Sequence, residues 1–399
     1  MQQPADSYWT KGYWRTKALF AFLRAPMRLY FRIANNFRCT PYKPKNPTFL
    51  LLTNHNSTVD HFLNCIGIRG VVRFVVSDHL LRKGFASKVL KFLVNPIPRR
   101  KGSSAEPTVK MIQQNLRLGM PVIMYAEGNR SFNGRTGFIS PRTGELVKNA
   151  EGSLITYRID GAYMQTPRWG ISRRHGPVFG SVVREYSREE LNQMSAEEIY
   201  AHIKEDLSCD AYAYQKQHNY RYKAKNKAEK LETTLFVCPK CESLGTLRSE
   251  GDRFFCSCGM SVSVNDYGFF EGADARFESV YDWDMWQRGV LKARADELRG
   301  KDELFTQDKG MTLYLVNGDE KQKLGSQMDM RLYGDRLDFV GDTTVSFPIG
   351  DITGTAVAHT LFLYFSANGK YYEVHSSCGP WAANKYFALH RMLNQMNYV

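Results

Sequence analysis

A histidine and an aspartate five positions apart directly follow a run of apolar residues. His55 and Asp60 lie in the segment Asn54-His55-Asn56-Ser57-Thr58-Val59-Asp60, after Thr-Phe-Leu-Leu-Leu-Thr at 48–53. If a buried strand ends before His55 and a helix begins near Ser57, the carboxylate can reach back to the imidazole. Such a carboxylate fixes the ring tautomer, and the other ring nitrogen can take a proton from a substrate hydroxyl. The pair therefore predicts general-base chemistry that needs no protein nucleophile.

The same residues also have a purely structural interpretation. Ser57 followed three positions later by Asp60 fits the start of a helix, with the serine as N-cap and an acid in the first turn. The choice between the two interpretations depends on residues further along the chain.

Two further segments carry residues that suit an anionic ligand. Pro96-Ile97-Pro98-Arg99-Arg100-Lys101-Gly102 places three cations in a turn-rich stretch, and the planar fork of arginine suits phosphate. A strand predicted at 122–125 runs into Ala126-Glu127-Gly128-Asn129-Arg130-Ser131. The carboxyl end of a strand is where α/β proteins place ligand groups. The structural alternatives are a solvated basic loop and an ordinary loop.

The order of these three blocks resembles the glycerolphosphate and 1-acylglycerol-3-phosphate (lysophosphatidic acid) acyltransferase family. Asn54-His55-x-Ser57-x-x-Asp60 is similar to the family's first block, and Arg100 falls at the arginine of the second. Glu127-Gly128-x-Arg130-Ser131 is similar to the third block. The resemblance extends over about residues 15–215.

The resemblance implies an O-acyltransferase with His55 as general base and Asp60 as the group that orients it. The acceptor hydroxyl would attack the thioester of acyl-CoA or of an acyl carrier protein, with no cofactor for catalysis. The implied acceptor is a lysophospholipid, most simply 1-acylglycerol-3-phosphate, which would give phosphatidic acid. The implied substrate-binding residues are Arg99, Arg100, Glu127, Gly128, Arg130 and Ser131.

The blocks depart from the family pattern at several positions, which keeps two alternatives open. Tyr125-Ala126 stands where the family usually has Phe-Pro, and Asn129 where it usually has Thr. The nearest match to the fourth block is Ser153–Pro167. One alternative is an acyltransferase that acts on a different lysolipid. The other is a non-catalytic membrane- or partner-binding protein that retains the fold.

Four of the eight cysteines form two closely spaced pairs. They are Cys238 and Cys241 in Cys-Pro-Lys-Cys, and Cys256 and Cys258 in Cys-Ser-Cys-Gly. Four thiolates on two turns make a closed tetrahedral site for Zn²⁺, which predicts a structural rather than a catalytic metal. The alternatives are unmetallated thiols or an iron site. The other cysteines are scattered, as ordinary thiols of a reducing compartment are.

The pattern of apolar and turn residues predicts an α/β fold: an acyltransferase-type sheet flanked by helices, followed by a zinc ribbon and a small β-rich domain with a C-terminal helix. The last part loosely resembles a pleckstrin-homology or GRAM-type domain. Strands are expected at 48–53, 71–76, 121–125, 311–316, 328–332, 336–340, 343–347, 360–365 and 371–375. Helices are expected at 8–36, where Pro26 should break or kink the helix, and at 86–94, 107–118, 283–299 and 382–396.

We expect six units along the chain. They are an interfacial membrane-binding helical region at 1–40, the acyltransferase domain at 41–218, a linker at 219–234, the zinc ribbon at 235–265, a helical connector at 266–310 and the β-rich domain at 311–399.

The chain carries a formal net charge of +14, which points to an anionic partner such as a nucleic acid, a membrane surface or a phosphorylated substrate. In residues 8–36, cations alternate with aromatic and aliphatic residues, as at a bilayer headgroup boundary. The alternative is a helix that packs on its own domain with a solvated basic face. No apolar stretch approaches the roughly 20 residues of a membrane helix, and the N-terminus lacks a signal-peptide pattern. We therefore expect a cytoplasmic protein bound peripherally to the inner face of the cell membrane. The ribbon is not basic, so nucleic-acid binding is not expected.

Overall fold

The computed structural model describes residues 7–70, 73–82, 84–100, 102–318, 320–358 and 360–396. Parts of the expected units at 1–40 and 311–399, of the strand at 71–76 and of the basic turn at 96–102 lie outside these ranges. Among the helices within them, none is long and apolar enough to cross a membrane.

The first half of the chain forms a seven-stranded mixed sheet. From one edge to the other, its strands are β1 Phe37–Cys39, β7 Val178–Tyr186, β6 Ser153–Asp160, β2 Phe49–Thr53, β5 Val122–Tyr125, β3 Arg73–Ser77 and β4 Ile97–Arg99. Of the strand pairs that the described residues form in this sheet, only β6–β7 is antiparallel. All five residues of the central strand β2 are buried, as expected of a parallel strand covered on both faces.

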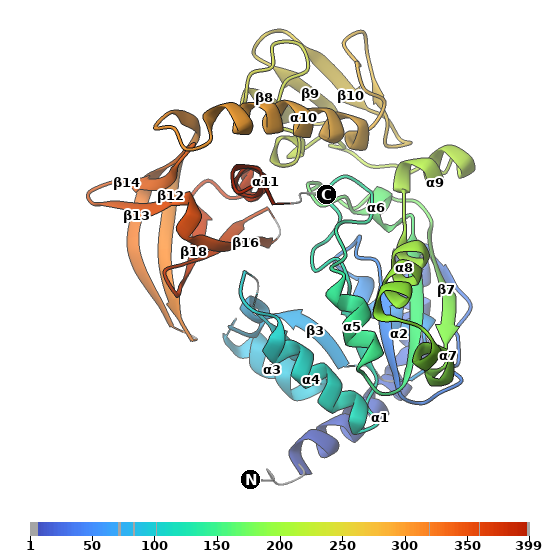
Figure 1. The fold of residues 1–399 in the computed structure, drawn as a ribbon. Helices are drawn as coiled ribbons and strands as arrows, with labels where there is room; N and C mark the ends of the chain where they lie inside the picture. The colour runs from blue at the N-terminus through green and yellow to red at the C-terminus, as the bar shows by residue number, and fades with distance from the viewer. Residues whose placement is uncertain are drawn as a thin grey trace.

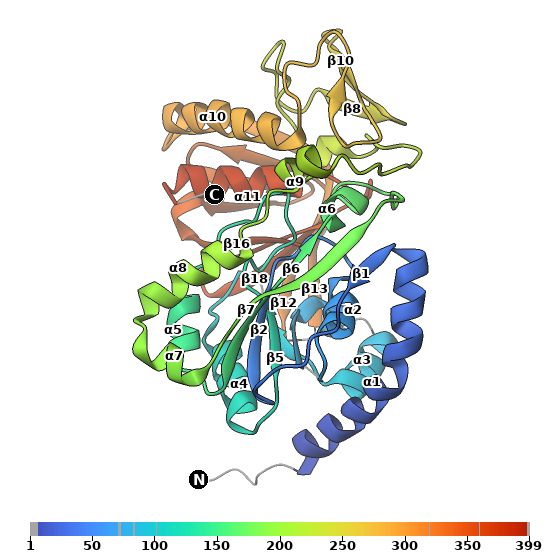
Figure 2. The same ribbon diagram turned by 90° about the vertical axis from the view of Figure 1, so that its right-hand side faces the viewer.

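Helices cover both faces of this sheet (Figure 2), and each face has its own apolar core. On one face lie α1 (Ser7–Ala34) and α2 (Asp60–Gly67), with α3 (Gly84–Val94) packed against α1. On the other face lie α4 (Glu106–Arg117), α5 (Arg142–Lys148), α7 (Arg188–Gln193) and α8 (Ala196–Leu207). The α/β architecture predicted from the sequence is therefore confirmed.

The first helix continues through its proline. Pro26 lies inside α1 and does not end it, and the ribbon changes direction along its length in Figure 2. Of the two outcomes expected at this position, a break or a kink, the helix shows the kink. A proline removes one hydrogen bond from the helix and displaces the preceding turn, which bends a helix that other contacts hold together.

A small antiparallel sheet carries the cysteine pairs. Its strands are β8 (Leu247–Glu250), β9 (Arg253–Cys256), β10 (Ser261–Val264) and β11 (Phe270–Glu271). Residues 219–234 follow α9 (Ala211–His218) and pack against this sheet. The short helix α6 (Ala162–Gln165) contributes to the same apolar core. Within residues 219–234 the buried Lys227 places its Nζ 2.7 Å from Asp252 Oδ2 and 3.2 Å from Asp266 Oδ1. The segment expected to be a linker is therefore fastened to the cysteine-bearing sheet by a buried cation.

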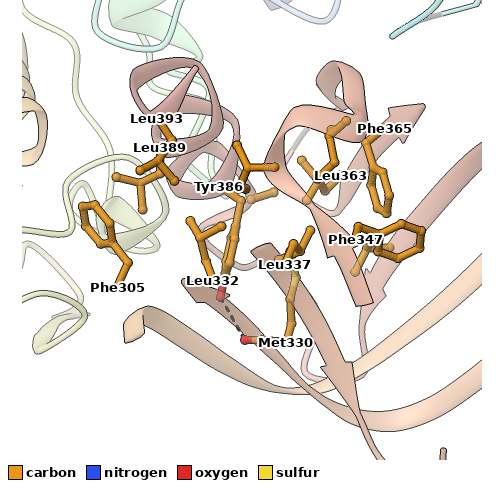
Figure 3. Close-up of a cluster of buried hydrophobic side chains, with 14 of the residues drawn as sticks. Phe305, Met330, Leu332, Leu337, Phe347, Leu363, Phe365, Tyr386, Leu389 and Leu393 are labelled. Carbon is orange, nitrogen blue, oxygen red and sulfur yellow. Dashed lines mark hydrogen bonds between the residues drawn. The ribbon is translucent and has the colours of Figure 1, made fainter. Parts of the chain in front are cut away.

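The last quarter of the chain is a seven-stranded antiparallel sheet with a helix packed on it (Figure 3). Across the sheet, its strands are β15 Thr344–Pro348, β14 Arg336–Val340, β13 Glu320–Tyr333, β12 Leu304–Asn317, β18 Lys370–Ser376, β17 Phe362–Ala367 and β16 Ile352–Ala358. The C-terminal helix α11 (Ala383–Leu393) packs Tyr386, Leu389 and Leu393 against this core. The Tyr386 hydroxyl donates a hydrogen bond of 3.3 Å to the Met330 carbonyl. The β-rich region with its final helix is confirmed, although the sequence did not indicate β16.

Helix α10 (Val280–Leu298) runs between the cysteine-bearing sheet and the C-terminal sheet (Figure 1). Its buried Asp284 accepts a hydrogen bond of 2.7 Å from the Asn133 side chain, which belongs to the first half of the chain. Two residues further on, Arg135 donates to the Tyr281 hydroxyl at 2.8 Å. The loop that contains Arg130 and Ser131 is therefore anchored on a helix about 150 residues later in the chain.

Candidate active site

His55 and Asp60 are in direct contact at the carboxyl end of the central strand. His55 Nδ1 lies 2.8 Å from Asp60 Oδ2. The Asp60 side chain is fully buried, whereas the His55 side chain is 16% exposed. The two residues meet because β2 ends at Thr53 and α2 begins at Asp60, so that the chain between them folds back on itself. The geometry predicted from the spacing is present.

Asp60 is the centre of a hydrogen-bond network. Its Oδ2 also accepts the backbone N–H groups of Asn56 and Ser57, both at 2.8 Å, and its Oδ1 accepts the Ser57 hydroxyl. Ser57 therefore binds the carboxylate and does not cap the helix, whose N-cap residue is Val59. Burial raises the pKa of Asp60. The hydrogen bonds from His55 and Ser57 and the charge on His55 outweigh burial, so that the net pKa lies below its ordinary value.

The Tyr125 ring packs against one face of the His55 imidazole. The two rings stack with centroids 4.0 Å apart and an interplanar angle of 22°. The contact results from strand register, because Thr53 of β2 is paired with Tyr125 of the parallel strand β5. In the sequence, Tyr125 stood out only as a departure from the family pattern. Its stacking role depends on a pairing between strands that are far apart in the chain.

Glu127 connects the two loops that carry the candidate residues. Its Oε1 accepts the His55 backbone N–H at 2.9 Å, and its Oε2 accepts that of Gly137 at 2.6 Å. Burial raises the pKa of Glu127 to about 7, although the backbone hydrogen bonds from Gly137 and His55 lower it. Glu127 therefore fixes the position of the backbone that holds the imidazole.

A cavity of about 1090 Å³ opens beside His55 and Glu127. Its apolar wall includes Val75, Val76, Leu80, Val109, Ile112, Met124, Phe138 and Leu146. Its cationic residues include Arg99, Arg130, Arg142 and Arg168. A space of this size with a mainly apolar wall and a few convergent charges is suited to a ligand that has an apolar tail and an anionic group.

The residues after Glu127 have different surroundings. Gly128 is exposed and has a φ of 65°, in the left-handed region that favours glycine. Arg130 donates to the Thr166 carbonyl at 2.7 Å and to the Asn56 carbonyl at 3.4 Å. Ser131 is 3% exposed, and its hydroxyl donates to the Arg135 carbonyl at 2.6 Å. Gly128 and Arg130 thus line the cavity, whereas Ser131 holds the loop together.

The two arginines of the basic turn face different ways. Arg99 lines the cavity and donates to the Ser103 carbonyl at 2.9 Å. Arg100 places its Nε 3.5 Å from Asp78 Oδ2, with its guanidinium 4.8 Å from the Tyr371 ring centroid. Arg100, expected to bind substrate, therefore contacts the C-terminal sheet, while its neighbour faces the cavity.

Arg142 and Arg168 were missed by the sequence reasoning. Arg168 is 7% exposed, donates to the Arg130 carbonyl at 2.8 Å, and lies 3.9 Å from the Phe132 ring centroid. Neither residue belongs to one of the three blocks, and nothing in the local sequence distinguishes either from the other arginines. Only the folded chain brings them to the cavity.

The four predicted metal ligands come together at the edge of the cysteine-bearing sheet. The sulfur atoms of Cys238, Cys241, Cys256 and Cys258 all lie within 4.8 Å of one another. Cys238 and Cys258 are 3.7 Å apart, and Cys241 and Cys256 are 3.8 Å apart. A tetrahedron with metal–sulfur distances of about 2.3 Å has edges of roughly 3.8 Å. The four thiols can therefore hold a tetrahedral metal ion.

The raised pKa of Glu127 predicts a pH-dependent difference between the wild type and Glu127→Gln. Between about pH 4.5 and about pH 7, Glu127 releases its proton in the unfolded chain but keeps it in the folded protein. This group therefore stabilises the folded state below pH 4.5, and that contribution is lost as the pH rises through 7. We expect the unfolding midpoint of the wild type to fall relative to that of the variant over this range, as measured by circular dichroism.

Glu303→Gln, at an exposed position, is the matched control and should show no such trend. A constant difference between the wild type and Glu127→Gln at every pH would contradict the assignment.

Comparisons with known proteins find a family and a solved structure that this chain is similar to. The family model described as Acyltransferase matches residues 36–160. Among solved structures, this chain is similar to the 1-acyl-sn-glycerophosphate (LPA) acyltransferase PlsC from Thermotoga maritima. The match covers 47% of this chain and 78% of the PlsC chain. The two are 17% identical, with a TM-score of 0.39. A comparison with curated proteins finds no match.

The segment that matches the family model begins just before β1 and ends with β6, and it includes both loops that form the candidate site. This segment, which includes His55, Asp60, Glu127 and Arg130, is the part of the chain that is similar to the acyltransferase family.

Proposed function

We propose that this protein is an O-acyltransferase that moves a fatty acyl group from acyl-CoA or an acyl carrier protein to a hydroxyl of a lysophospholipid. The observation that carries the proposal is the His55–Asp60 pair, with its 2.8 Å contact, at the wall of a cavity that is mainly apolar and is lined by four arginines. The imidazole is held by a buried carboxylate and by the Tyr125 ring. This is the arrangement that a general base requires.

In this mechanism the imidazole of His55 accepts the proton of the acceptor hydroxyl as that oxygen attacks the thioester carbonyl. Asp60 keeps the Nδ1 proton on its own side of the ring and stabilises the imidazolium that forms. When the tetrahedral intermediate collapses, the carbon–sulfur bond breaks and the imidazolium returns the proton to the leaving thiolate. Acyl transfer then needs no covalent enzyme intermediate.

The arginines support an acceptor that carries a phosphate. Arg99, Arg130 and Arg168 line the cavity, and a guanidinium binds phosphate oxygens through two parallel hydrogen bonds. We assign acceptor binding to Arg99, Arg130, Glu127 and Gly128, with Arg100 and Ser131 as residues that position these loops. The acceptor that best combines an acyl chain, a free hydroxyl and a phosphate is 1-acylglycerol-3-phosphate, and its product would be phosphatidic acid. A different lysolipid with a phosphate in the same place is the alternative.

His55→Ala should lower acyl transfer by about 10²–10⁴-fold, because positioned general-base catalysis is worth about that much. The measurement is lipid mass spectrometry of the products after incubation with acyl donors and a panel of lysolipids. His202→Ala, which removes a histidine on α8 that pairs with Glu205, is the matched control and should keep wild-type turnover.

Equal rates for His55→Ala and the wild type on every acceptor would exclude catalysis by this site. They would favour the second candidate, a non-catalytic membrane- or partner-binding protein with the acyltransferase fold.

We also propose that the four cysteines hold a structural Zn²⁺. Two of the thiols, Cys238 and Cys256, are buried, and four sulfur ligands leave no open position for a substrate. The residue before the first pair is held from outside the cluster, because the Trp283 indole donates to the Val237 carbonyl at 2.9 Å. When bound, the ion would tie the turn of the first pair to the end of β9 and so stabilise the packing of α10.

Cys241→Ser should reduce bound zinc and lower the stability of the C-terminal half of the chain. Elemental analysis of the purified protein gives the zinc content, and thermal unfolding gives the stability. Cys378→Ser, at an exposed cysteine outside the cluster, should change neither. Wild-type protein prepared without chelators that contains no zinc would refute this proposal.

The six expected units are retained as a proposal. The cysteine pairs lie in their own small sheet, which supports a separate ribbon, and its strand β11 extends past the expected limit at 265. The antiparallel order β15-β14-β13-β12-β18-β17-β16, followed by α11, supports a pleckstrin-homology-like unit that begins with β12, before the expected limit at 311.

We further propose that the protein binds the anionic inner face of the cell membrane through α1 and α3, as a cytoplasmic peripheral protein. The two helices contact each other, since the Arg15 guanidinium lies 3.6 Å from the Phe92 ring centroid. Their exposed apolar residues include Phe22, Leu29, Tyr30, Ile33, Phe85, Val89 and Phe92. Their exposed cations include Lys17, Arg28, Arg32, Lys88 and Lys91. Apolar side chains beside cations suit the headgroup boundary of an anionic bilayer.

A Phe22→Asp/Ile33→Asp variant should lose most of the binding to phosphatidylglycerol vesicles that the wild type shows in sedimentation. Both residues are more than three-quarters exposed, at 79% and 77%, so the fold should tolerate the change. Met285→Asp, at a 44% exposed position on α10, should bind as the wild type does. Undiminished sedimentation of the double variant would rule out this surface.

A further inference from the structure

The cavity beside His55 is not built by the acyltransferase half of the chain alone. Two of its lining residues, Ala356 and Ala358, belong to β16 of the C-terminal sheet, nearly 200 residues after the segment that matches the family. They stand two positions apart on one strand, so their side chains point to the same face. The residue between them, Val357, packs into the core of the C-terminal sheet.

The C-terminal sheet is held against the cavity by close contacts. The Ser366 hydroxyl donates to the Gly102 carbonyl at 2.8 Å, and Arg100 lies over the Tyr371 ring. A Cβ atom at Gly354 would lie only 2.7 Å from the Gly102 oxygen. The backbone of β16 contacts the backbone at residue 102 directly, because Gly354 and Gly102 have no side chains to separate them. The position of β16 relative to the basic turn is therefore fixed closely.

On their own sheet, the two alanines belong to a small apolar cluster with Val316, Tyr364 and Tyr371. Gly102 follows the edge strand β4, whose neighbour β3 contributes Val75 and Val76 to the cavity wall. A methylene chain gains free energy from burial against such an apolar surface.

We propose that Ala356 and Ala358 are specificity-determining residues that set the length of the acyl chain that the cavity accepts. The inference rests on the proposed acyltransferase function and adds a role for the C-terminal sheet, which completes the substrate site. Small side chains on a strand whose position is fixed leave room that a longer chain can fill. Larger side chains at the same positions would occupy that room. The chain in question is that of the acyl donor or that of the lysolipid acceptor.

The test uses the full-length protein with Ala356→Leu and Ala358→Leu. Each is assayed first with acyl-CoA donors of increasing chain length and one lysolipid, and then with one donor and lysolipids of increasing chain length. We expect kcat/KM for the longest chain to fall about tenfold or more relative to the shortest, because steric exclusion of a methylene from an apolar pocket has an effect of that order. The series that shows the change identifies which of the two chains lies against β16.

Thr353→Leu is the matched control, because Thr353 is exposed on the same strand and does not line the cavity. It should leave the chain-length profile unchanged. Ala356→Val and Ala358→Val repeat the test with a smaller increase in volume if the leucine variants fail to fold. An unchanged profile in folded variants, or an equal loss for all chain lengths, would overturn the inference.

A binding measurement separates this inference from the proposed function. A fluorescent long-chain fatty acid should bind the wild type more tightly than Ala356→Leu, and a short-chain analogue should bind both equally. If the wild type transfers no acyl group but this difference in binding is present, the proposed function fails and the chain-length role remains. Equal binding of the long-chain probe to both proteins would remove the role of β16.

Discussion

The carboxylate of Asp60 is the interaction on which the candidate site depends. It is fully buried and accepts hydrogen bonds from the backbone of Asn56 and Ser57, from the Ser57 hydroxyl and from the His55 ring. A buried charge is costly unless its lone pairs are satisfied, so these donors are needed to keep it ionised. The same donors fix the loop between β2 and α2. One group thus shapes the loop and orients the imidazole.

The surrounding structure supports this loop from several directions. Glu127 accepts the His55 N–H, and the His55 carbonyl accepts the Ser131 N–H at 2.8 Å. The loop after Ser131 is in turn held by the contact of Asn133 with α10, and Phe132 stacks on Phe387 of α11 with centroids 6.5 Å apart. The elements added after the acyltransferase segment therefore contact the loops that form the site. These later elements pack directly against the acyltransferase half of the chain.

The cavity has the same composite origin. The acyltransferase sheet supplies the imidazole, the arginines and most of the apolar wall, and β16 closes one side with two alanines. Contacts between backbones tolerate little change in side-chain size, as Gly102 and Gly354 illustrate. Selectivity for the acyl chain can thus be tuned on the C-terminal sheet without any change to the groups that carry out the chemistry.

The sequence alone determined the parts that depend on local spacing. The His55–Asp60 contact, the thiol cluster and the alternation of helices and strands were all predicted, because each needs only a turn, a short loop or a hydrophobic period to form. What the sequence could not show depends on pairings between distant segments. The stacking of Tyr125 on His55 depends on the register of β2 with β5. Arg168 reaches the cavity from a loop that contains no motif. Arg100 contacts the C-terminal sheet, whereas its neighbour Arg99 faces the cavity. Ala356 and Ala358 become part of the site only when β16 docks beside Gly102. Nothing in the sequence distinguishes them from other alanines, because their small size matters only where they line a cavity.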